Sequence, residues 1–109
     1  PKGGEKMTSP EYIEFVAERL SAFYDVRYKK MFGEYMIYIE DKPVITVCDN
    51  TVFVKMYPEL SEIMKDAEIG KPYPSAKDCY ILDIEDETLC QKILPILIEK
   101  TPLPKKKKA

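Results

Sequence analysis

Between residues 26 and 56 the chain contains four short runs of β-branched and aromatic residues, separated only by gaps of turn length. The runs cover residues 26–31, 35–40, 44–48 and 51–56. Connections this short cannot make the crossover that a parallel strand pair requires. The four runs therefore predict an antiparallel meander, which restricts the chain to folds that contain a sheet of this kind.

Turn-forming residues stand in each gap of this segment. Gly33 follows the first run, residues 41–43 (Asp-Lys-Pro) follow the second, and Asp49 with Asn50 follows the third. Asp and Asn tolerate a positive φ, as glycine does, so the Asp49-Asn50 pair predicts a two-residue hairpin. The register of the meander is therefore expected to be set by its turns.

Helical patterns flank the meander. Ser9 and Pro10 are a cap and a first helical residue, and a stripe with helical spacing follows them. Asp86 is expected to cap a final helix over 87–100. Between them we expect a middle helix at 59–67, ended by Gly70, and a fifth strand at 79–84. The apolar stripe of the first helix comprises Ile13, Val16, Leu20 and Phe23.

These elements predict the α+β class. The expected architecture has two layers: an antiparallel sheet of about five strands, packed with N-terminal, middle and C-terminal helices. The 109 residues suffice for one domain, which we place at 8–101. Residues 1–7 are expected to form a disordered leader, and residues 102–109 a disordered tail rich in Pro and Lys.

The strands carry apolar residues on both of their faces. Residues 36–39 (Met-Ile-Tyr-Ile) and 52–54 (Val-Phe-Val) do not alternate with polar residues. A sheet with one solvated face is expected to alternate. If all helices cover one face, the other face is an apolar surface of the kind that marks an interface. We therefore predict a homodimer or a partner surface on the sheet; the alternative is that helices cover both faces.

The composition disfavours catalysis. The chain has no histidine, so the commonest general base and the usual metal ligand are both missing. It also lacks a glycine-rich phosphate loop. We predict a non-enzymatic protein with no cofactor and no metal. The weaker alternative is a small enzyme that uses Cys48 or the acidic cluster Asp83, Glu85, Asp86 and Glu87, which we otherwise interpret as the start of a helix.

The cysteines indicate the compartment. Cys48, Cys79 and Cys90 are odd in number and widely spaced, and each lies in an apolar neighbourhood. They are interpreted as small hydrophobic residues in a reducing environment. No apolar run approaches the length of a membrane span, so we expect a cytoplasmic protein with no membrane partner.

A basic cluster in the first strand suggests a second class of function. Cations interleaved with aromatic residues can neutralise phosphates and stack on bases, which gives the alternative of a nucleic-acid-binding accessory domain. Without its four tail lysines, however, the chain has 13 basic and 19 acidic residues, a charge of −6 that repels nucleic acid. Nucleic acid is thus an unexpected or indirect partner. The candidate residues are Arg27, Lys29, Lys30, Lys105, Lys106, Lys107 and Lys108.

The block at 29–35 (Lys-Lys-Met-Phe-Gly-Glu-Tyr), followed by Ile37 and Tyr38, resembles the N-terminal domain of the TfoX/Sxy family of competence regulators. Later blocks are similar to short single-domain members, among them 72–77 (Pro-Tyr-Pro-Ser-Ala-Lys) and 80–83 (Tyr-Ile-Leu-Asp). The resemblance runs from about Pro10 to the tail. It departs where many short members have histidine and this chain has Cys79.

The resemblance implies helices against an antiparallel sheet, as in secretion-chaperone-like folds, and no enzymatic activity. In two-domain relatives this domain precedes a C-terminal domain, and the whole protein promotes transcription of DNA-uptake genes. We expect a regulatory module of the short kind, without that C-terminal domain, which acts through contacts with an unidentified protein.

The same block supplies the candidate residues for binding a partner. Gly33 permits a tight turn, and the large apolar residues beside it are suited to an adaptable contact surface. The alternative is a β-bulge whose apolar residues fill the core. The candidates are Lys29, Lys30, Met31, Phe32, Gly33, Tyr35 and Tyr38.

Overall fold

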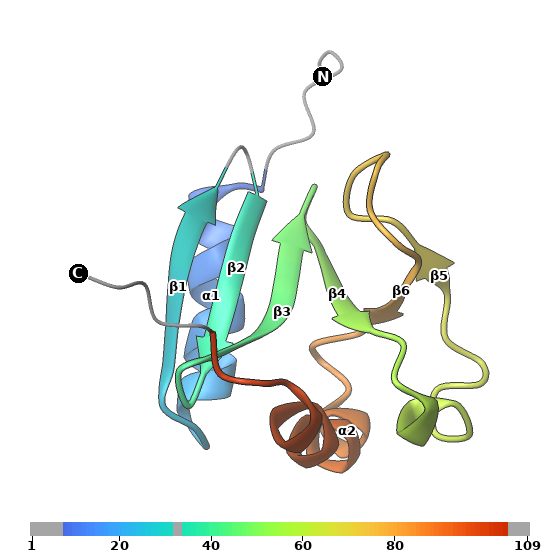
Figure 1. The fold of residues 1–109 in the computed structure, drawn as a ribbon. Coiled ribbons are helices and arrows are strands. Elements are labelled where there is room, and N and C mark those ends of the chain that lie inside the picture. The colour runs from blue at the N-terminus through green and yellow to red at the C-terminus, as the bar shows by residue number, and fades with distance from the viewer. Residues whose placement is uncertain (1–7, 32–33, 105–109) are drawn as a thin grey trace.

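Six strands form one sheet in the computed structural model, in the order β1-β2-β3-β4-β6-β5, with every neighbouring pair antiparallel (Figure 1). The structure describes residues 8–31 and 34–104; the predicted leader, Phe32, Gly33 and residues 105–109 lie outside this range. The strands are β1 (Val26–Met31), β2 (Glu34–Ile39), β3 (Lys42–Cys48), β4 (Thr51–Lys55), β5 (Ile69–Gly70) and β6 (Cys79–Leu82), and the helices are α1 (Pro10–Ser21) and α2 (Glu87–Lys100).

The predicted α+β class and the meander of β1 to β4 are confirmed, with one strand more than expected. Asp49 and Asn50 both have positive φ, near 54° and 53°, as a two-residue hairpin requires. The β2–β3 turn lies at Glu40 and Asp41, slightly before its predicted position, and both residues again have positive φ. Pro43 therefore lies inside β3, beside a register shift, where a residue without an N–H is tolerated.

Both helices begin at the predicted caps. The Ser9 hydroxyl accepts a 3.1 Å hydrogen bond from the Tyr12 N–H, and the Asp86 carboxylate accepts one of the same length from the Leu89 N–H. A residue distant in sequence also holds the start of α1, because the Ser9 N–H donates a 3.0 Å hydrogen bond to the Asn50 side chain. The β3–β4 turn thus orients the first helix.

The predicted middle helix is wrong. Residues Pro58–Leu60 form a single 3-10 turn without a side-chain cap, and only irregular turns follow it to residue 67. The apolar pattern in this segment reflects tertiary anchoring instead, since Leu60 and Met64 are both fully buried. A short uncapped segment does not recover the cost of starting an α-helix, whereas burying two side chains stabilises a turn equally well.

Gly70 does not end a helix but lies in the short strand β5, which the sequence analysis did not predict. It pairs with Cys79 on β6. A side chain at this position would lie 3.2 Å from Ile81 Cδ1 and 3.5 Å from the Phe53 ring. Glycine therefore allows the edge strand β5 to pack closely against β6 and β4.

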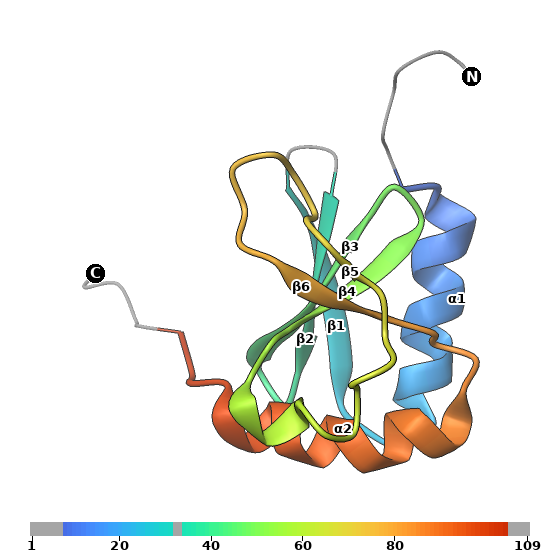
Figure 2. The ribbon, with the colours of Figure 1, turned by 90° about the vertical axis from the view of Figure 1, so that its right-hand side faces the viewer.

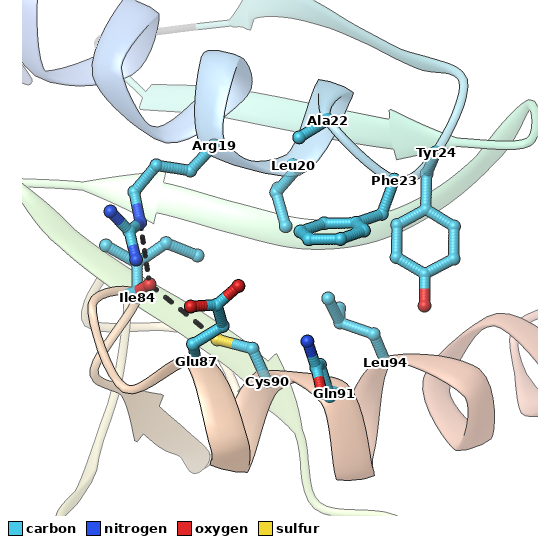
Figure 3. Close-up of a pocket in the computed structure, with 10 residues that line it drawn as sticks. All are labelled: Arg19, Leu20, Ala22, Phe23, Tyr24, Ile84, Glu87, Cys90, Gln91 and Leu94. Carbon is cyan, nitrogen blue, oxygen red and sulfur yellow. Dashed lines mark hydrogen bonds between the residues drawn. The ribbon is translucent and has the colours of Figure 1, made fainter.

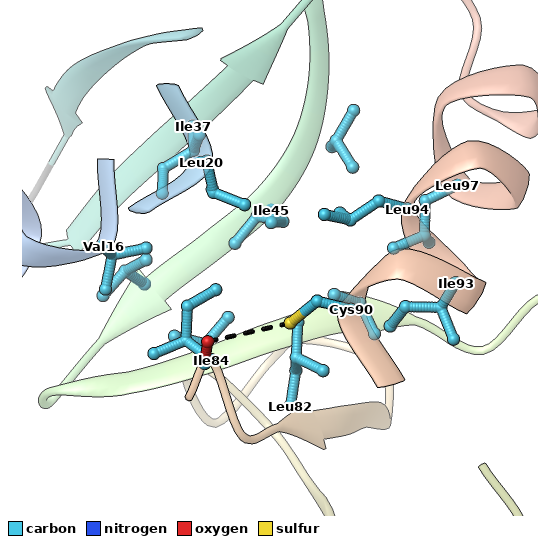
Figure 4. Close-up of a cluster of buried hydrophobic side chains, with 14 of the residues drawn as sticks. Val16, Leu20, Ile37, Ile45, Leu82, Ile84, Cys90, Ile93, Leu94 and Leu97 are labelled. Atoms are coloured by element: carbon cyan, nitrogen blue, oxygen red, sulfur yellow. Dashed lines mark hydrogen bonds between the residues drawn. The ribbon is translucent and has the colours of Figure 1, made fainter. Parts of the chain in front are cut away.

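The core lies between the helices and one face of the sheet, called here the inner face. This face carries fully buried residues such as Ile37, Ile45 and Val52, which pack against the apolar stripes of α1 and α2 (Figure 4). Figure 2 shows α1 standing beside the sheet and α2 running across its lower end, while the β5–β6 loop arches away on the other side. Within the described residues, no helix is long and apolar enough to cross a membrane.

Candidate functional site

The opposite face of the sheet, called here the outer face, carries no helix formed by residues 8–31 or 34–104 (Figure 2). Strand register assigns Met36, Thr46 and Phe53 to it, because their neighbours in sequence point into the core. The expectation that all helices cover one face, leaving apolar residues on the other, is thus met by α1 and α2. The outer face is the candidate binding surface of the molecule.

The outer face is hollowed into a groove of about 530 Å³, called here the outer groove. Its floor is formed by β1 to β4, and its far wall is formed by the β5–β6 loop at residues 72–79. Tyr73 stands on this wall and is 46% exposed, although it is a large aromatic side chain. Three methionines also line the groove, Met31, Met36 and Met56.

Glu34 places an unusual group in the outer groove. Its Oε1 atom is buried, and it has no hydrogen-bond partner among the described residues. Burial raises the pKa of this carboxyl above its ordinary value. A desolvated carboxylate oxygen with no donor among the described residues costs stability.

The structure separates the predicted partner-binding residues. Lys29, Met31 and Tyr38 belong to the outer face, and Met31 lines the groove itself. Lys30 and Tyr35 point to the opposite face, where Tyr35 is buried in the core. The core alternative therefore holds for Tyr35 and not for Met31. Phe32 and Gly33 lie outside the described residues.

The basic cluster of β1 is divided in the same way, as its alternation predicts. Arg27 shares the outer face with Lys29, and Lys30 points away from both. The Arg27 guanidinium lies 4.3 Å from the centre of the Tyr38 ring, and its Nε is 3.5 Å from an Asp41 carboxylate oxygen. It is thus already engaged within the hairpin. The tail residues Lys105, Lys106, Lys107 and Lys108 lie outside the described range.

The acidic cluster is used to begin α2. The Asp86 carboxylate caps the helix, and the Asp83 carboxylate accepts a 3.0 Å hydrogen bond from the Glu85 N–H. Burial raises the pKa of Cys90 to about 11, and burial also raises that of Cys79, so both thiols stay protonated near neutral pH. Within residues 8–31 and 34–104 no Cys, Asp or Glu side chains gather as a metal site.

Of the residues that line the outer groove, only Met31 was among the predicted site residues. Met56, Tyr73 and Glu34 were not among them. Met56 follows β4, Tyr73 lies between β5 and β6, and Glu34 is the first residue of β2, so no shared local pattern connects them. Strand pairing provides the only signal that brings them together: once β4 and β6 are neighbours, the loop before β6 must pass over the outer face. The groove could therefore be recognised only once the strand order of the sheet was known.

Comparison with known proteins gives one informative relative. The chain is 36% identical over 104 residues to an uncharacterized 12.7 kDa protein in the trpE 5' region of Spirochaeta aurantia. The alignment covers 94% of this chain and 90% of that protein. No protein-family model matches the chain, and no solved structure matches it.

Proposed function

This chain belongs to the same family as the Spirochaeta aurantia protein, and we propose that it is a non-enzymatic regulatory module that binds a protein partner. The observation that carries the proposal is the outer groove, an apolar surface left open by both helices. Contiguous apolar surface of this kind usually marks a site of interaction.

The composition of the groove supports a protein rather than a rigid small ligand. Methionine is unbranched and polarisable, so Met31, Met36 and Met56 can adjust to side chains of different shapes. Tyr73 adds a large contact area together with a hydroxyl group at the rim. This combination is typical of surfaces that accommodate a segment of another chain.

The resemblance to the N-terminal domain of competence regulators supports a role in regulation. The block that carries it includes Met31 and Glu34, which both line the groove, and Tyr38, which shares the outer face. We propose that the module takes part in transcriptional control of DNA uptake through protein contacts. Direct recognition of DNA is the weaker alternative, because Arg27 is engaged and the neighbouring lysines diverge.

Site-specific photo-crosslinking in living cells tests this proposal. A photoreactive phenylalanine analogue at position 36 is expected to yield a defined crosslinked protein, because Met36 lies on the groove floor. The matched control carries the same analogue at position 14, an exposed residue of α1 on the other side of the molecule. Adding Tyr73→Asp should abolish the crosslink at position 36. Equal yields from positions 36 and 14 would contradict the proposal.

A second copy of the chain is one partner that the groove can take. The mass in solution, measured by analytical ultracentrifugation over a range of concentrations, distinguishes this case. A homodimer through the outer face should dissociate with Met36→Lys, which places a charge in the interface. A wild-type protein that stays monomeric throughout would refute the homodimer and leave a different protein as the partner.

A further inference from the structure

A second cavity lies on the other side of the molecule, between the end of α1 and the first half of α2 (Figure 3). It encloses about 380 Å³, which is within the range of small-molecule sites. Its floor is apolar and buried, formed by Leu20, Ile84 and Leu94. The outer groove shares none of its lining residues, so the two sites are separate.

Phe23 is the observation that points to a ligand. It follows Leu20 in the apolar stripe and was expected in the core, yet the structure leaves it 60% exposed. The helix ends at Ser21, so Phe23 leaves the stripe and its ring lies across the cavity opposite Gln91 (Figure 3). An exposed aromatic ring beside an apolar floor is a platform for another planar or apolar group.

The charges around the cavity favour a cation. Burial is the main cause of the raised pKa of Cys90 on the cavity wall; Asp86, Asp83 and Glu87 add to it, and the Arg19 guanidinium opposes them. Arg19 is partly occupied, because its Nε donates a 3.1 Å hydrogen bond to the Ile84 carbonyl and its guanidinium lies over the Phe15 ring. The Glu87 carboxylate projects over the cavity in Figure 3.

We propose that this cavity binds a small amine with an aromatic or apolar body. The body stacks on Phe23 and covers Leu20 and Leu94, and the ammonium group donates to the Glu87 carboxylate. An anion of the same shape is disfavoured by the surrounding carboxylates. The cavity thereby gives the module a ligand-binding site that is separate from its partner surface.

Three probes of matched shape test the proposal: 2-phenylethylamine, 2-phenylethanol and 3-phenylpropionate. Each is titrated into the 15N-labelled protein, and amide chemical shifts are followed by NMR. The amine is expected to bind with a dissociation constant on the order of 1 mM, as its size permits. The shifts should be largest at Ala22, Phe23 and Gln91, and the anion should bind at least about fivefold more weakly.

Two variants assign the contacts. Glu87→Gln should weaken the amine roughly fivefold and leave 2-phenylethanol unchanged, since only the charge is lost. Phe23→Ala should weaken all three probes, and its exposure means that the core is untouched. Glu99→Gln is the matched control, an exposed carboxylate at the far end of α2.

Four results would overturn the proposal. The first is the absence of saturable shifts with any probe, and the second is tighter binding of the anion than of the amine. The third is a change at the same amides on diluting the protein alone, which would show that a second copy occupies the cavity. Shifts confined to the outer groove would count against it equally.

Discussion

The Lys42 ammonium donates a 2.7 Å hydrogen bond to the backbone carbonyl of Ile98, which joins the first residue of β3 to the last turn of α2. A carbonyl at a helix C-terminus has no partner within the helix, and the dipole there attracts a cation. The contact is partly buried, so solvent competes with it weakly. The contact ties the C-terminal turn of α2 to the start of β3.

Replacing this lysine should loosen α2. We expect Lys42→Met to lower the free energy of unfolding by about 1–2 kcal/mol, because the carbonyl loses a charged donor. Urea denaturation measures the change. Lys92→Met, an exposed lysine on the same helix, is the control and should have almost no effect. Equal losses in the two variants would mean that the Lys42 contact contributes nothing specific.

The β3–β4 turn offers a pair of substitutions that separate two effects. Asn50→Gly removes only the acceptor of the Ser9 N–H and should cost about 0.5–1 kcal/mol. Asn50→Ala also places a Cβ at a φ of 53° and should cost a further 1–2 kcal/mol or so. Thermal melting compares the two variants. Identical stabilities would show that the turn is not strained by alanine.

Cys90 should be the slowest thiol to react. Its pKa of about 11 leaves almost no thiolate near pH 7.5, and its side chain is buried. Labelling with a maleimide followed by mass spectrometry should modify the partly exposed Cys79 first. Preferential labelling of Cys90 in the native protein would show that the cavity beside it opens.

The same pKa predicts how stability depends on pH. The folded state favours the protonated thiol, so the contribution of Cys90 is complete below pH 9 and is lost as pH rises toward 11. The difference in unfolding free energy between the wild type and Cys90→Ala should therefore shrink over that interval. A difference that is constant with pH would contradict the shift.

Glu34 should be more costly to the fold when it is ionised. Because burial raises its pKa, the folded state favours the protonated carboxyl, which is populated at low pH. Glu34→Gln should raise the free energy of unfolding at pH 7, and this gain should disappear as pH falls below about 4.5. Glu14→Gln, on the exposed side of α1, is the control. A destabilised Glu34→Gln protein would show that the carboxylate has a stabilising role.

We expect no binding of short duplex DNA at about 0.15 M salt, because the chain without its tail carries a charge of −6. Weak binding at low salt should fall steeply with salt and vanish when all four tail lysines are replaced by serine. Fluorescence anisotropy measures both. Binding at physiological salt that is lost in Lys29→Ala would favour the nucleic-acid alternative instead.

The sequence predicted the elements that local chemistry determines. Asp86 alone defines the start of α2, and the Asp49-Asn50 pair defines a hairpin wherever the rest of the chain lies. Errors occurred where tertiary contacts decide. Leu60 and Met64 have helical spacing but serve as anchors of an irregular segment, and the two-residue strand β5 is too short to have a period.

The candidate sites, too, could be predicted where local sequence patterns determine them and not where tertiary contacts do. Apolar residues on both faces of β2 correctly indicated a surface that the helices leave open. The contributions of Glu34 and Tyr73 depend on how the β5–β6 loop returns over the sheet, which no local pattern encodes. Phe23 fits the helical period and still escapes burial, because α1 ends two residues before it.

The floor and the far wall of the outer groove differ in how freely their sequences can change. The floor is made of strands whose other side is the core, so evolution can alter its backbone only at the expense of the fold. The opposite wall is a single surface loop, where residues can be inserted or deleted at little cost. Members of this family can therefore diverge in the width of their groove, and so in the partners they accept, while keeping the same sheet beneath it.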